Sequence, residues 1–281
     1  MTIRETIKKG MINLKTNGIE EPNLKARLLM QFILNKPRQY LLIYDNQTLS
    51  LRQEVNYFKA IKKIISGVPL QHITHMQEFM KMNFYVDENV LIPRSDTEIL
   101  VEEVINISKK INAKKILDLC TGSGAIAISL AKYIENSEIT AVDISKKALE
   151  IARTNAKNND VENQITFVES DLFKNLKEGK YDVIVSNPPY IKREVIKKLN
   201  KDVQKEPIIA LDGGYDGLDF YRKIINESEK YLKFNGYLCF EIGYDQKEDV
   251  IGIIKNKERY INTYSKKDLY GNDRIIITKL S

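Results

Sequence analysis

Short apolar runs alternate with longer helical segments over most of the chain after residue 90, and this pattern constrains the fold more than any other. Such alternation is typical of a mostly parallel β-sheet with helices on both faces. We predict strands at about 115–119, 138–143, 165–169, 181–186, 236–242, 260–265 and 273–279. Helices are expected at about 96–110, 125–134, 145–158, 217–233 and 246–255. A short connection through Gly271 joins the last two strands, so the last strand should be antiparallel.

The segment before this alternation predicts a small, separate helical domain. Two helical stripes of apolar residues stand out, Leu24, Leu28, Leu29 and Ile33 in one, and Val55, Phe58, Ile61, Ile64 and Ile65 in the other. Between them and the sheet, residues 71–87 end in a period-two alternation that predicts a β-hairpin. We therefore divide the chain into a helical domain at 1–68, a linker with a hairpin at 69–90 and an α/β domain at 91–281.

A glycine-containing turn follows the first strand of the predicted sheet and leads into a helix. It reads Asp118-Leu119-Cys120-Thr121-Gly122-Ser123-Gly124-Ala125. Glycine permits positive φ and lets a ligand approach the backbone closely. The next strand ends at Asp143, close to the roughly 20-residue spacing expected for a carboxylate that binds ribose hydroxyls. The pattern predicts a nucleoside cofactor and leaves NAD and S-adenosylmethionine both open.

The strand at 181–186 stops abruptly at Asn187-Pro188-Pro189-Tyr190. Proline has no backbone N–H for a sheet ladder, and it holds the residue before it extended, with carbonyls free to accept hydrogen bonds. An amide, free carbonyls and an aromatic ring thus lie at the carboxyl end of a strand, where open α/β sheets bind ligands. This combination suits a planar NH2 group, such as the amide of glutamine or the exocyclic amine of adenine. Together with Asp118, it favours S-adenosylmethionine over NAD.

The pattern Asp-x-x-x-Gly-x-Gly, the acid at Asp143 and the Asn-Pro-Pro-Tyr motif together resemble class I S-adenosylmethionine-dependent methyltransferases. Further stretches narrow the resemblance to the PrmC/HemK family, which are protein-(glutamine-N5) methyltransferases that modify peptide chain release factors. These are Gly67-Val68-Pro69-Leu70-Gln71-His72-Ile73, Val90-Leu91-Ile92-Pro93-Arg94-Ser95-Asp96-Thr97-Glu98, Glu206-Pro207, Ala210-Leu211-Asp212-Gly213-Gly214, Asp216-Gly217-Leu218, Phe220-Tyr221-Arg222, Glu241-Ile242-Gly243 with Gln246, and Lys267-Asp268-Leu269 with Gly271-Asn272-Asp273-Arg274. The resemblance runs from about residue 67 to the C-terminus and extends more weakly through the N-terminal helices.

This resemblance implies a Rossmann-like, mostly parallel sheet with an antiparallel last strand, and a small all-helical N-terminal domain joined to it by a β-hairpin. It also implies that 91–281 is the catalytic domain. The reaction would transfer a methyl group from S-adenosyl-L-methionine to the side-chain N5 of the glutamine in the Gly-Gly-Gln motif of class I release factors. Glutamine methylation of a ribosomal protein, or methylation of adenine N6 in nucleic acid, is the alternative. A cofactor-binding scaffold without catalysis is a more remote one.

The resemblance also implies cofactor-binding residues. The backbone from Cys120 to Gly124 would lie against the methionine portion and the ribose, which brings in Thr121, Gly122 and Ser123. Asp143 would accept the ribose hydroxyls. Asp171 would accept from the adenine amine, with Leu172 near the ring, and Asn187 would border the cofactor as well as the substrate. Asp118 has two readings of similar weight, ordering the turn or touching the ligand.

The Asn-Pro-Pro-Tyr motif would bind the substrate. The Asn187 side-chain oxygen and the Pro188 carbonyl would each accept one amide hydrogen, and Tyr190 would pack against the amide plane, with Pro189 completing the pocket. No general base is required, because positioning and electrostatics can aim the nitrogen lone pair at the methyl group.

Two residues depart from the family pattern. Cys120 stands where the family has a glycine, and because a Cβ restricts φ we expect a negative φ there. Leu172 stands where some relatives have a tryptophan beside the adenine, so some affinity should be lost. For Arg94, pinning the hairpin is favoured over binding the cofactor carboxylate. Glu241 and the pair Asp273-Arg274 are expected to form internal ion pairs.

Composition bears on partners and location. The net charge is +6, and basic residues that follow the Asn-Pro-Pro-Tyr motif are expected to rim the site, namely Lys192, Arg193, Lys197, Lys198 and Lys201. No apolar run approaches the roughly 20 residues of a membrane span, and the N-terminus lacks a signal-peptide core. We expect a cytoplasmic monomer without a metal, a membrane or a stable nucleic-acid complex. Cys120 and Cys239 should be buried thiols in strands, and His72 and His75 should belong to a polar loop.

Overall fold

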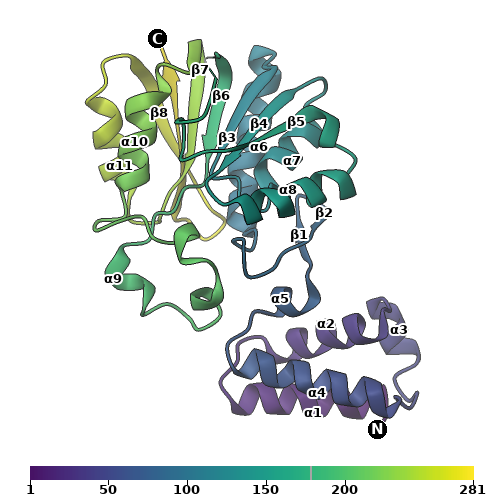
Figure 1. The fold of residues 1–281 in the computed structure, drawn as a ribbon. Helices are drawn as coiled ribbons and strands as arrows, with labels where there is room; N and C mark the ends of the chain where they lie inside the picture. The colour runs from purple at the N-terminus through teal and green to yellow at the C-terminus, as the bar shows by residue number, and fades with distance from the viewer. Residues whose placement is uncertain (178) are drawn as a thin grey trace. The chain divides into compact units, whose positions relative to one another are not determined.

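The computed structural model describes residues 1–177 and 179–281 and divides into two compact units (Figure 1). The first unit contains Met1–His75 and Asn200–Lys205. The second contains Met76–Leu199 and Glu206–Ser281. No helix within the described ranges is both long and apolar enough to cross a membrane.

The first unit is helical, as predicted. Its helices are α1 (Ile3–Thr16), α2 (Pro22–Leu34), α3 (Arg38–Ile43), α4 (Leu51–Ile65) and α5 (Leu70–Thr74). Capping boxes start α1 and α4, because the hydroxyls of Thr2 and Ser50 accept from the backbone three residues later while Glu5 and Gln53 reach back. Helix α5 contains His72 and is followed by His75 in the left-handed conformation, so the polar loop expected there is wrong.

The apolar stripes predicted for α2 and α4 were only partly correct. In α2, Leu24 and Leu28 are exposed, and the face packed in the core presents Ala26, Leu29 and Met30. This helix is apolar on most sides, so periodicity alone does not single out the buried face. In α4, Val55 is exposed, and the buried positions are Tyr57, Ala60, Ile61 and Ile64.

The second unit begins with the expected β-hairpin. Strand β1 (Gln77–Phe79) pairs antiparallel with β2 (Met82–Phe84). The rings of Phe79 and Phe84 meet edge to face at a centroid distance of 6.0 Å. Both rings are buried, so the hairpin is anchored through its apolar face.

A seven-stranded sheet forms the centre of the second unit and has the order β5-β4-β3-β6-β7-β9-β8. Strands β3, β4, β5, β6 and β7 pair in parallel, whereas β9 is antiparallel to both of its neighbours. The predicted fold class is confirmed. The strands are β3 (Lys115–Leu119), β4 (Glu138–Asp143), β5 (Ile165–Glu169), β6 (Tyr181–Ser186), β7 (Leu232–Glu241), β8 (Tyr260–Lys267) and β9 (Asp273–Leu280).

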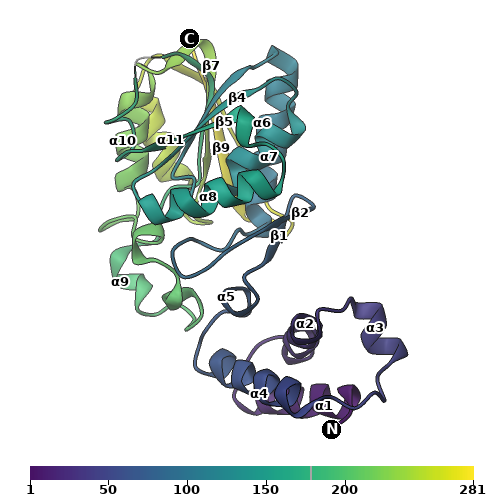
Figure 2. The ribbon, with the colours of Figure 1, turned by 45° about the vertical axis from the view of Figure 1, so that its right-hand side comes forward.

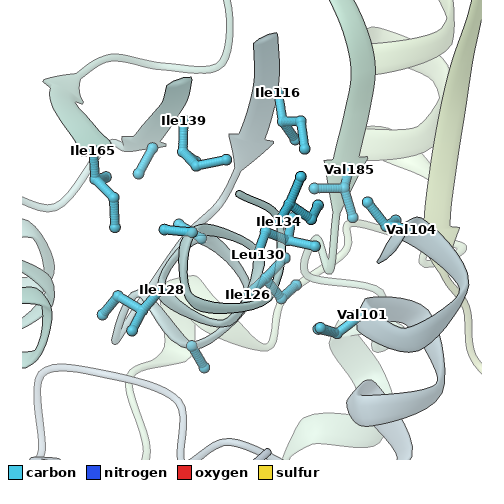
Figure 3. Close-up of a cluster of buried hydrophobic side chains, with 14 of the residues drawn as sticks. Val101, Val104, Ile116, Ile126, Ile128, Leu130, Ile134, Ile139, Ile165 and Val185 are labelled. Carbon is cyan, nitrogen blue, oxygen red and sulfur yellow. The ribbon is translucent and has the colours of Figure 1, made fainter. Parts of the chain in front are cut away.

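Helices cover both faces of this sheet (Figure 2). On one face lie α6 (Ser95–Ile111), α7 (Ala125–Tyr133) and α8 (Lys146–Asn158), and on the other lie α10 (Asp219–Ser228) and α11 (Lys247–Lys255). Successive strand residues point to opposite faces, so Ile116 packs in the first core and Leu117 in the second. Figure 3 shows the first core, where Ile126 and Leu130 of α7 lie among residues of the sheet and of α6.

The helix expected at 217–233 is shorter than predicted, because it begins at Asp219 and ends at Ser228. The chain turns into β7 at Leu232, which pairs with Tyr181 of β6, so the strand begins earlier than the expected residue 236. Sheet pairing here overrides the local helical pattern. Between β6 and α10 lie the short helix α9 (Arg193–Ile196) and 3₁₀ turns at Val203–Lys205 and Ile208–Ala210.

Two helix glycines offer a matched test of packing. A Cβ on Gly10 of α1 would lie 2.7 Å from Cε1 of the buried Tyr57 ring, whereas a Cβ on Gly252 of α11 would meet nothing within 4 Å. Gly10→Ala should lower the free energy of unfolding of the first unit, since overpacking costs about 1–3 kcal/mol and exceeds a helix-propensity gain of about 1 kcal/mol. Gly252→Ala should raise the stability of the second unit by roughly 0.5–1 kcal/mol. Urea unfolding followed by circular dichroism measures both, and a Gly10→Ala protein more stable than the parent would contradict the packing argument.

Candidate active site

A cavity of about 120 Å³ lies at the carboxyl ends of the parallel strands in the second unit. It is at the switch point of the sheet, where the strand order runs one way from β3 to β4 and the other way from β3 to β6. Its lining comes mainly from the loops that follow β3, β4, β5 and β6, with contributions from 89–91, 207–210 and Phe220. The lining residues are Asn89, Val90, Leu91, Cys120, Gly122, Val142, Asp143, Ile144, Ser145, Ala148, Ser170, Asp171, Leu172, Asn187, Pro189, Pro207, Ile209, Ala210 and Phe220.

The turn after β3 contains alternating left-handed residues, with φ of 62° at Cys120, 55° at Gly122 and 82° at Gly124. The negative φ expected at Cys120 is therefore wrong. The Thr121 N–H donates to the Val142 carbonyl of β4 at 2.9 Å, so the neighbouring strand fixes the backbone direction directly after Cys120. A non-glycine residue in this conformation costs about 1–2 kcal/mol. Cys120 also lies just beyond β3 and not within a strand, and its thiol and that of the buried Cys239 are free.

The Asp118 side chain holds this turn in place through hydrogen bonds. Its buried carboxylate accepts the Thr121 hydroxyl at 2.6 Å and the Ala127 N–H at 3.2 Å, so it joins the end of β3 to the start of α7. Burial raises the pKa of Asp118 to about 7. Of its two readings, the contacts support the turn-ordering one, because Asp118 is not part of the cavity lining.

Asp143 combines a backbone role with a place in the cavity. One carboxylate oxygen accepts the Gly122 N–H at 2.8 Å, and the other accepts the Ser145 N–H at 2.9 Å. Burial raises the pKa of this carboxyl group. A carboxylate offers about four acceptor sites, so two backbone bonds leave capacity for a ligand diol.

Asp171 and Leu172 follow β5 and line the same cavity. The Asp171 carboxylate lies 2.5 Å from Nζ of Lys174. Leu172 is buried and has a φ of 54°, and it forms part of an apolar wall together with Val90 and Phe220. The site thus offers an acceptor beside an apolar surface of the kind that suits a purine.

Three residues of the predicted cofactor turn do not line the cavity. Thr121 directs its hydroxyl to Asp118, and the Ser123 carbonyl accepts the Asn155 side chain at 2.9 Å. Gly124 faces inward, where a Cβ would lie 2.9 Å from Ile128 and 3.1 Å from Ala152. By contrast, a Cβ on Gly122 would meet nothing within 4 Å, so this glycine leaves open space at the cavity wall.

The Asn-Pro-Pro-Tyr segment is held closely at both ends. Ser186, just before it, donates its hydroxyl to the Leu119 carbonyl at 2.7 Å, and Gln246 donates to the Tyr190 carbonyl at 2.9 Å. A Cβ on Gly213 would lie only 2.7 Å from the Tyr190 Cα, which explains why glycine is needed opposite the motif. Asn187 and Pro189 line the cavity, whereas Pro188 and Tyr190 are not among its lining residues.

Buried polar side chains form hydrogen bonds with Asn187 and Tyr190 of the motif. The Asn187 amide nitrogen donates to the Thr97 hydroxyl at 3.2 Å, Thr97 donates to the Glu241 carboxylate, and the Tyr190 hydroxyl donates to the same carboxylate at 3.2 Å. Burial raises the pKa of Glu241 and of the Tyr190 hydroxyl. Sequence reasoning missed Thr97 and the contacts of Gln246. No local sequence signal marks them, because Thr97 and Glu241 are 144 residues apart and Gln246 and Tyr190 are 56 residues apart.

The expected ion pairs are partly different in the structure. Arg274 pairs with Asp268 at 3.0 Å and Asp96 at 3.4 Å, and Asp273 pairs with Lys247 at 3.4 Å. Glu241 instead bonds to hydroxyl groups, as its position deep in the core beside Thr97 dictates.

Arg94 has a structural role, but not the one expected for it. It pairs with Glu206, which also accepts the Ile92 N–H at 3.0 Å. The hairpin is held by Glu98, which accepts the Met80 N–H at 2.7 Å. Arg94 is therefore tied to the loop before α10 and not to the hairpin turn.

Two basic residues of the predicted rim form ion pairs with acidic residues of the second unit. Arg193 donates to Asp212 at 2.8 Å, and Lys192 lies 4.0 Å from Asp245. Lys201 belongs to the first unit, so the predicted cluster is not a single surface of the second one.

Sequence families match both parts of the chain. Residues 5–74 match the PrmC N-terminal domain, and residues 95–247 match the methyltransferase small domain. Among solved structures, a ribosomal protein methylase from Lactobacillus delbrueckii subsp. bulgaricus is similar with a TM-score of 0.51 at 17% identity, covering 74% of this chain and 99% of that one. A methyltransferase from Pyrococcus furiosus is similar with a TM-score of 0.52 at 20% identity, covering 78% and 96%. These likenesses support the methyltransferase fold of the second unit.

Curated relatives match nearly the whole chain. The release factor glutamine methyltransferase of Clostridium acetobutylicum is 40% identical over 283 residues, which cover 99% of this chain and 98% of that protein. The release factor glutamine methyltransferase of Moorella thermoacetica is 37% identical and covers 99% and 98%. The chain belongs to the release factor glutamine methyltransferase family.

Proposed function

We propose that this chain transfers the methyl group of S-adenosyl-L-methionine to the side-chain N5 of the glutamine in the Gly-Gly-Gln motif of a class I peptide chain release factor. The observation that carries the proposal is that Asp143 and Asn187 line one cavity at the switch point of the sheet. A carboxylate suited to a ribose diol and an amide suited to a planar NH2 group therefore lie at the same site. Near-full-length similarity to release factor glutamine methyltransferases supports the substrate.

The residues around the cavity fit this cofactor. Asp143 would accept the ribose hydroxyls, Asp171 would accept from the adenine amine, and Leu172 would pack near the ring. The open space beside Gly122 leaves room for the methionine portion next to the backbone of Cys120. When bound, the cofactor supplies an electrophilic methyl group on a sulfonium.

The protein's contribution to catalysis is positioning. A glutamine amide nitrogen is a poor nucleophile because its lone pair is delocalised into the carbonyl. The Asn187 Oδ1 and the Pro188 carbonyl would each accept one amide hydrogen, which favours a pyramidal nitrogen and aims its lone pair at the methyl group. Tyr190 would pack against the amide plane and exclude water during the transfer, in which the nitrogen–carbon bond forms as the methyl–sulfur bond breaks. The alkylated nitrogen would then release its extra proton to solvent.

We also propose that the chain acts as a monomer in the cytoplasm, because its substrate acts in translation and one chain carries every residue assigned here. A stable complex with nucleic acid is not expected. Methylation of a ribosomal-protein glutamine or of adenine N6 uses the same NH2-binding chemistry, so the substrate experiment below includes both.

Asp143→Ala tests the cofactor assignment. Hydrogen bonds to a charged group contribute about 1.5–3 kcal/mol each, so losing this carboxylate should weaken S-adenosylmethionine binding at least about tenfold. Isothermal titration calorimetry measures the affinity, and circular dichroism checks the fold because Asp143 also holds the turn at Gly122. Asp249→Ala, an exposed acid of α11, is the control and should bind normally. Unchanged affinity in Asp143→Ala would remove this residue from the site.

Asn187→Ala tests the catalytic assignment. Removing one preorganised hydrogen-bonding group costs about 10²–10³ in rate, so turnover should fall by that factor while cofactor affinity changes little. Asn187→Asp keeps the shape and an acceptor oxygen but adds a charge near the substrate, and it should also be slow. Single-turnover kinetics with labelled cofactor give the rates. Near-parental turnover in Asn187→Ala would reduce Asn187 to a turn residue.

The substrate assignment is tested by offering labelled cofactor separately with a class I release factor, a ribosomal protein and nucleic acid. Label should enter the release factor at the Gly-Gly-Gln glutamine, because two glycines let an extended loop bring one side chain into a narrow pocket. Replacing that glutamine with alanine should abolish labelling. Continued labelling of this variant, or preferential labelling of nucleic acid or the ribosomal protein, would favour the alternative substrates.

A further inference from the structure

A buried hydrogen-bond chain leads from Glu241 through Thr97 to the cavity residue Asn187. Glu241 is 2% exposed and Thr97 is 4% exposed. The Thr97 hydroxyl donates to one Glu241 oxygen, and the Asn187 amide nitrogen lies 3.2 Å from the Thr97 oxygen. The Tyr190 hydroxyl donates to the other Glu241 oxygen at 3.2 Å. Residues from α6, β7 and the Asn-Pro-Pro-Tyr segment are thus joined behind the cavity.

In this series of hydrogen bonds, the number of available hydrogens decides which group donates in each bond. An ionised carboxylate only accepts, and a threonine hydroxyl has a single proton. If the Thr97 hydroxyl donates its one hydrogen bond to Glu241, the Thr97 oxygen can only accept from Asn187. Of the two ends of the Asn187 amide, the NH2 end must then face Thr97.

The oxygen end of Asn187 is consequently directed away from Thr97. Within residues 1–177 and 179–281, the structure gives this oxygen no hydrogen-bond partner, and Asn187 lines the cavity. The two ends of an amide have nearly the same shape but opposite hydrogen-bonding character. A flipped Asn187 would point two donors at the donor hydrogens of a substrate NH2 group, so its orientation decides whether it can bind that group.

We propose that Thr97 and Glu241 are positioning residues that hold the Asn187 amide with Oδ1 toward the substrate NH2 group. Glu241 accepts the hydrogen bond from the Thr97 hydroxyl, and the Thr97 oxygen is then left to accept from the NH2 end of Asn187. This inference rests on the proposed function, because it assumes that the acceptor at Asn187 receives a planar NH2 group.

The proposal needs an ionised Glu241, and the hydrogen bonds fit that state because its two carboxylate oxygens accept from the Thr97 and Tyr190 hydroxyls. Burial raises the pKa of Glu241 and the Asp96 charge adds to this, whereas the Thr97 hydroxyl, the Arg274 guanidinium and the Tyr190 hydroxyl lower it and offset part of the rise. Arg274 itself is held between Asp96 and Asp268. Protonated Glu241 would be able to donate to Thr97, which would free the Thr97 proton for Asn187 and remove the preference.

Thr97→Val and Thr97→Ser form the first test. Valine keeps the branched shape but offers no acceptor, so kcat should fall at least about tenfold, less than the 10²–10³ expected when the acceptor itself is lost. The KM for the release factor and the dissociation constant of the cofactor should stay within about twofold, since the orientation matters most at the reacting amide. Serine keeps the hydroxyl and should restore most of the turnover.

Thr278→Val is the matched control. Thr278 is another buried threonine of the same unit, and its hydroxyl bonds to the Thr263 hydroxyl at 2.8 Å and the Ile261 carbonyl at 3.3 Å. This variant should lose stability but keep its kcat. Equal losses of kcat in Thr278→Val and Thr97→Val would show a general packing effect and overturn the proposal.

A double-mutant cycle separates positioning from stability. If Thr97 acts through Asn187, adding Thr97→Val to Asn187→Ala should change kcat by less than about twofold, whereas independent effects would multiply. Glu241→Gln should give the same non-additive pattern and replaces Thr97→Val if that variant does not fold. Its amide can turn NH2 toward Thr97 and reverse the bond.

The outcomes distinguish this inference from the proposed function. A parental protein that does not methylate the release factor, or an Asn187→Ala variant with parental turnover, contradicts the proposed function. If Asn187→Ala is strongly impaired while Thr97→Val and Glu241→Gln keep parental kcat, only the positioning role is overturned. Multiplicative losses in the cycle overturn it as well.

Discussion

The site depends on the parallel pairing of β3 with β4 on one side and β6 on the other. Leu119, the last residue of β3, is in register with Val142 of β4 and Ser186 of β6. The three strands therefore end at nearly the same level, and the next residues along each strand direction are Cys120, Asp143 and Asn187. Three segments far apart in the sequence are brought together by backbone hydrogen bonds alone, before any side chain of the site makes a contact.

Strand pairing also explains why the backbone after β3 accepts strain. Thr121 and Gly122 are bonded to β4 through the Val142 carbonyl and the Asp143 carboxylate. Asp118 reinforces the same turn through the Thr121 hydroxyl and the Ala127 N–H. With the turn fixed from both sides, a left-handed Cys120 is tolerated although it costs about 1–2 kcal/mol.

The sheet could be predicted from the sequence because its central strands are short, mostly apolar runs bounded by polar or turn-forming residues. That signal is local, so β3 to β6 were placed correctly to the residue. The φ of Cys120 could not be predicted, since it depends on β4, about 20 residues away along the chain. The buried face of α2 was predicted only in part for a similar reason: in a helix that is apolar on most sides, the neighbouring helices decide which side is buried.

In the candidate site, the residues at strand ends could be predicted, whereas the residues packed beside them could not. Asp143 and Asn187 end apolar strands, so their meeting at one edge followed from the α/β pattern, and the structure places both at the cavity. Thr97 could not be found in this way, because its partner Glu241 is 144 residues distant in sequence. Such a pair is recognisable only when the packing of α6 against β7 is known.

The buried polar residues next to Asn187 cost free energy of desolvation that apolar residues in the same place would not. Taking the Glu241 carboxylate out of water is costly unless its oxygens are satisfied, and the bonds from Thr97 and Tyr190 satisfy both. A buried polar group left without its hydrogen-bond partner costs about 1–3 kcal/mol. Moving one of these hydrogen-bonded residues would leave another unsatisfied, so the set resists rearrangement. An apolar replacement could pack equally well but would leave the Asn187 amide free to turn. Burying Glu241 therefore costs stability, but the same hydrogen bonds hold Asn187 Oδ1 in a single direction at the cavity wall.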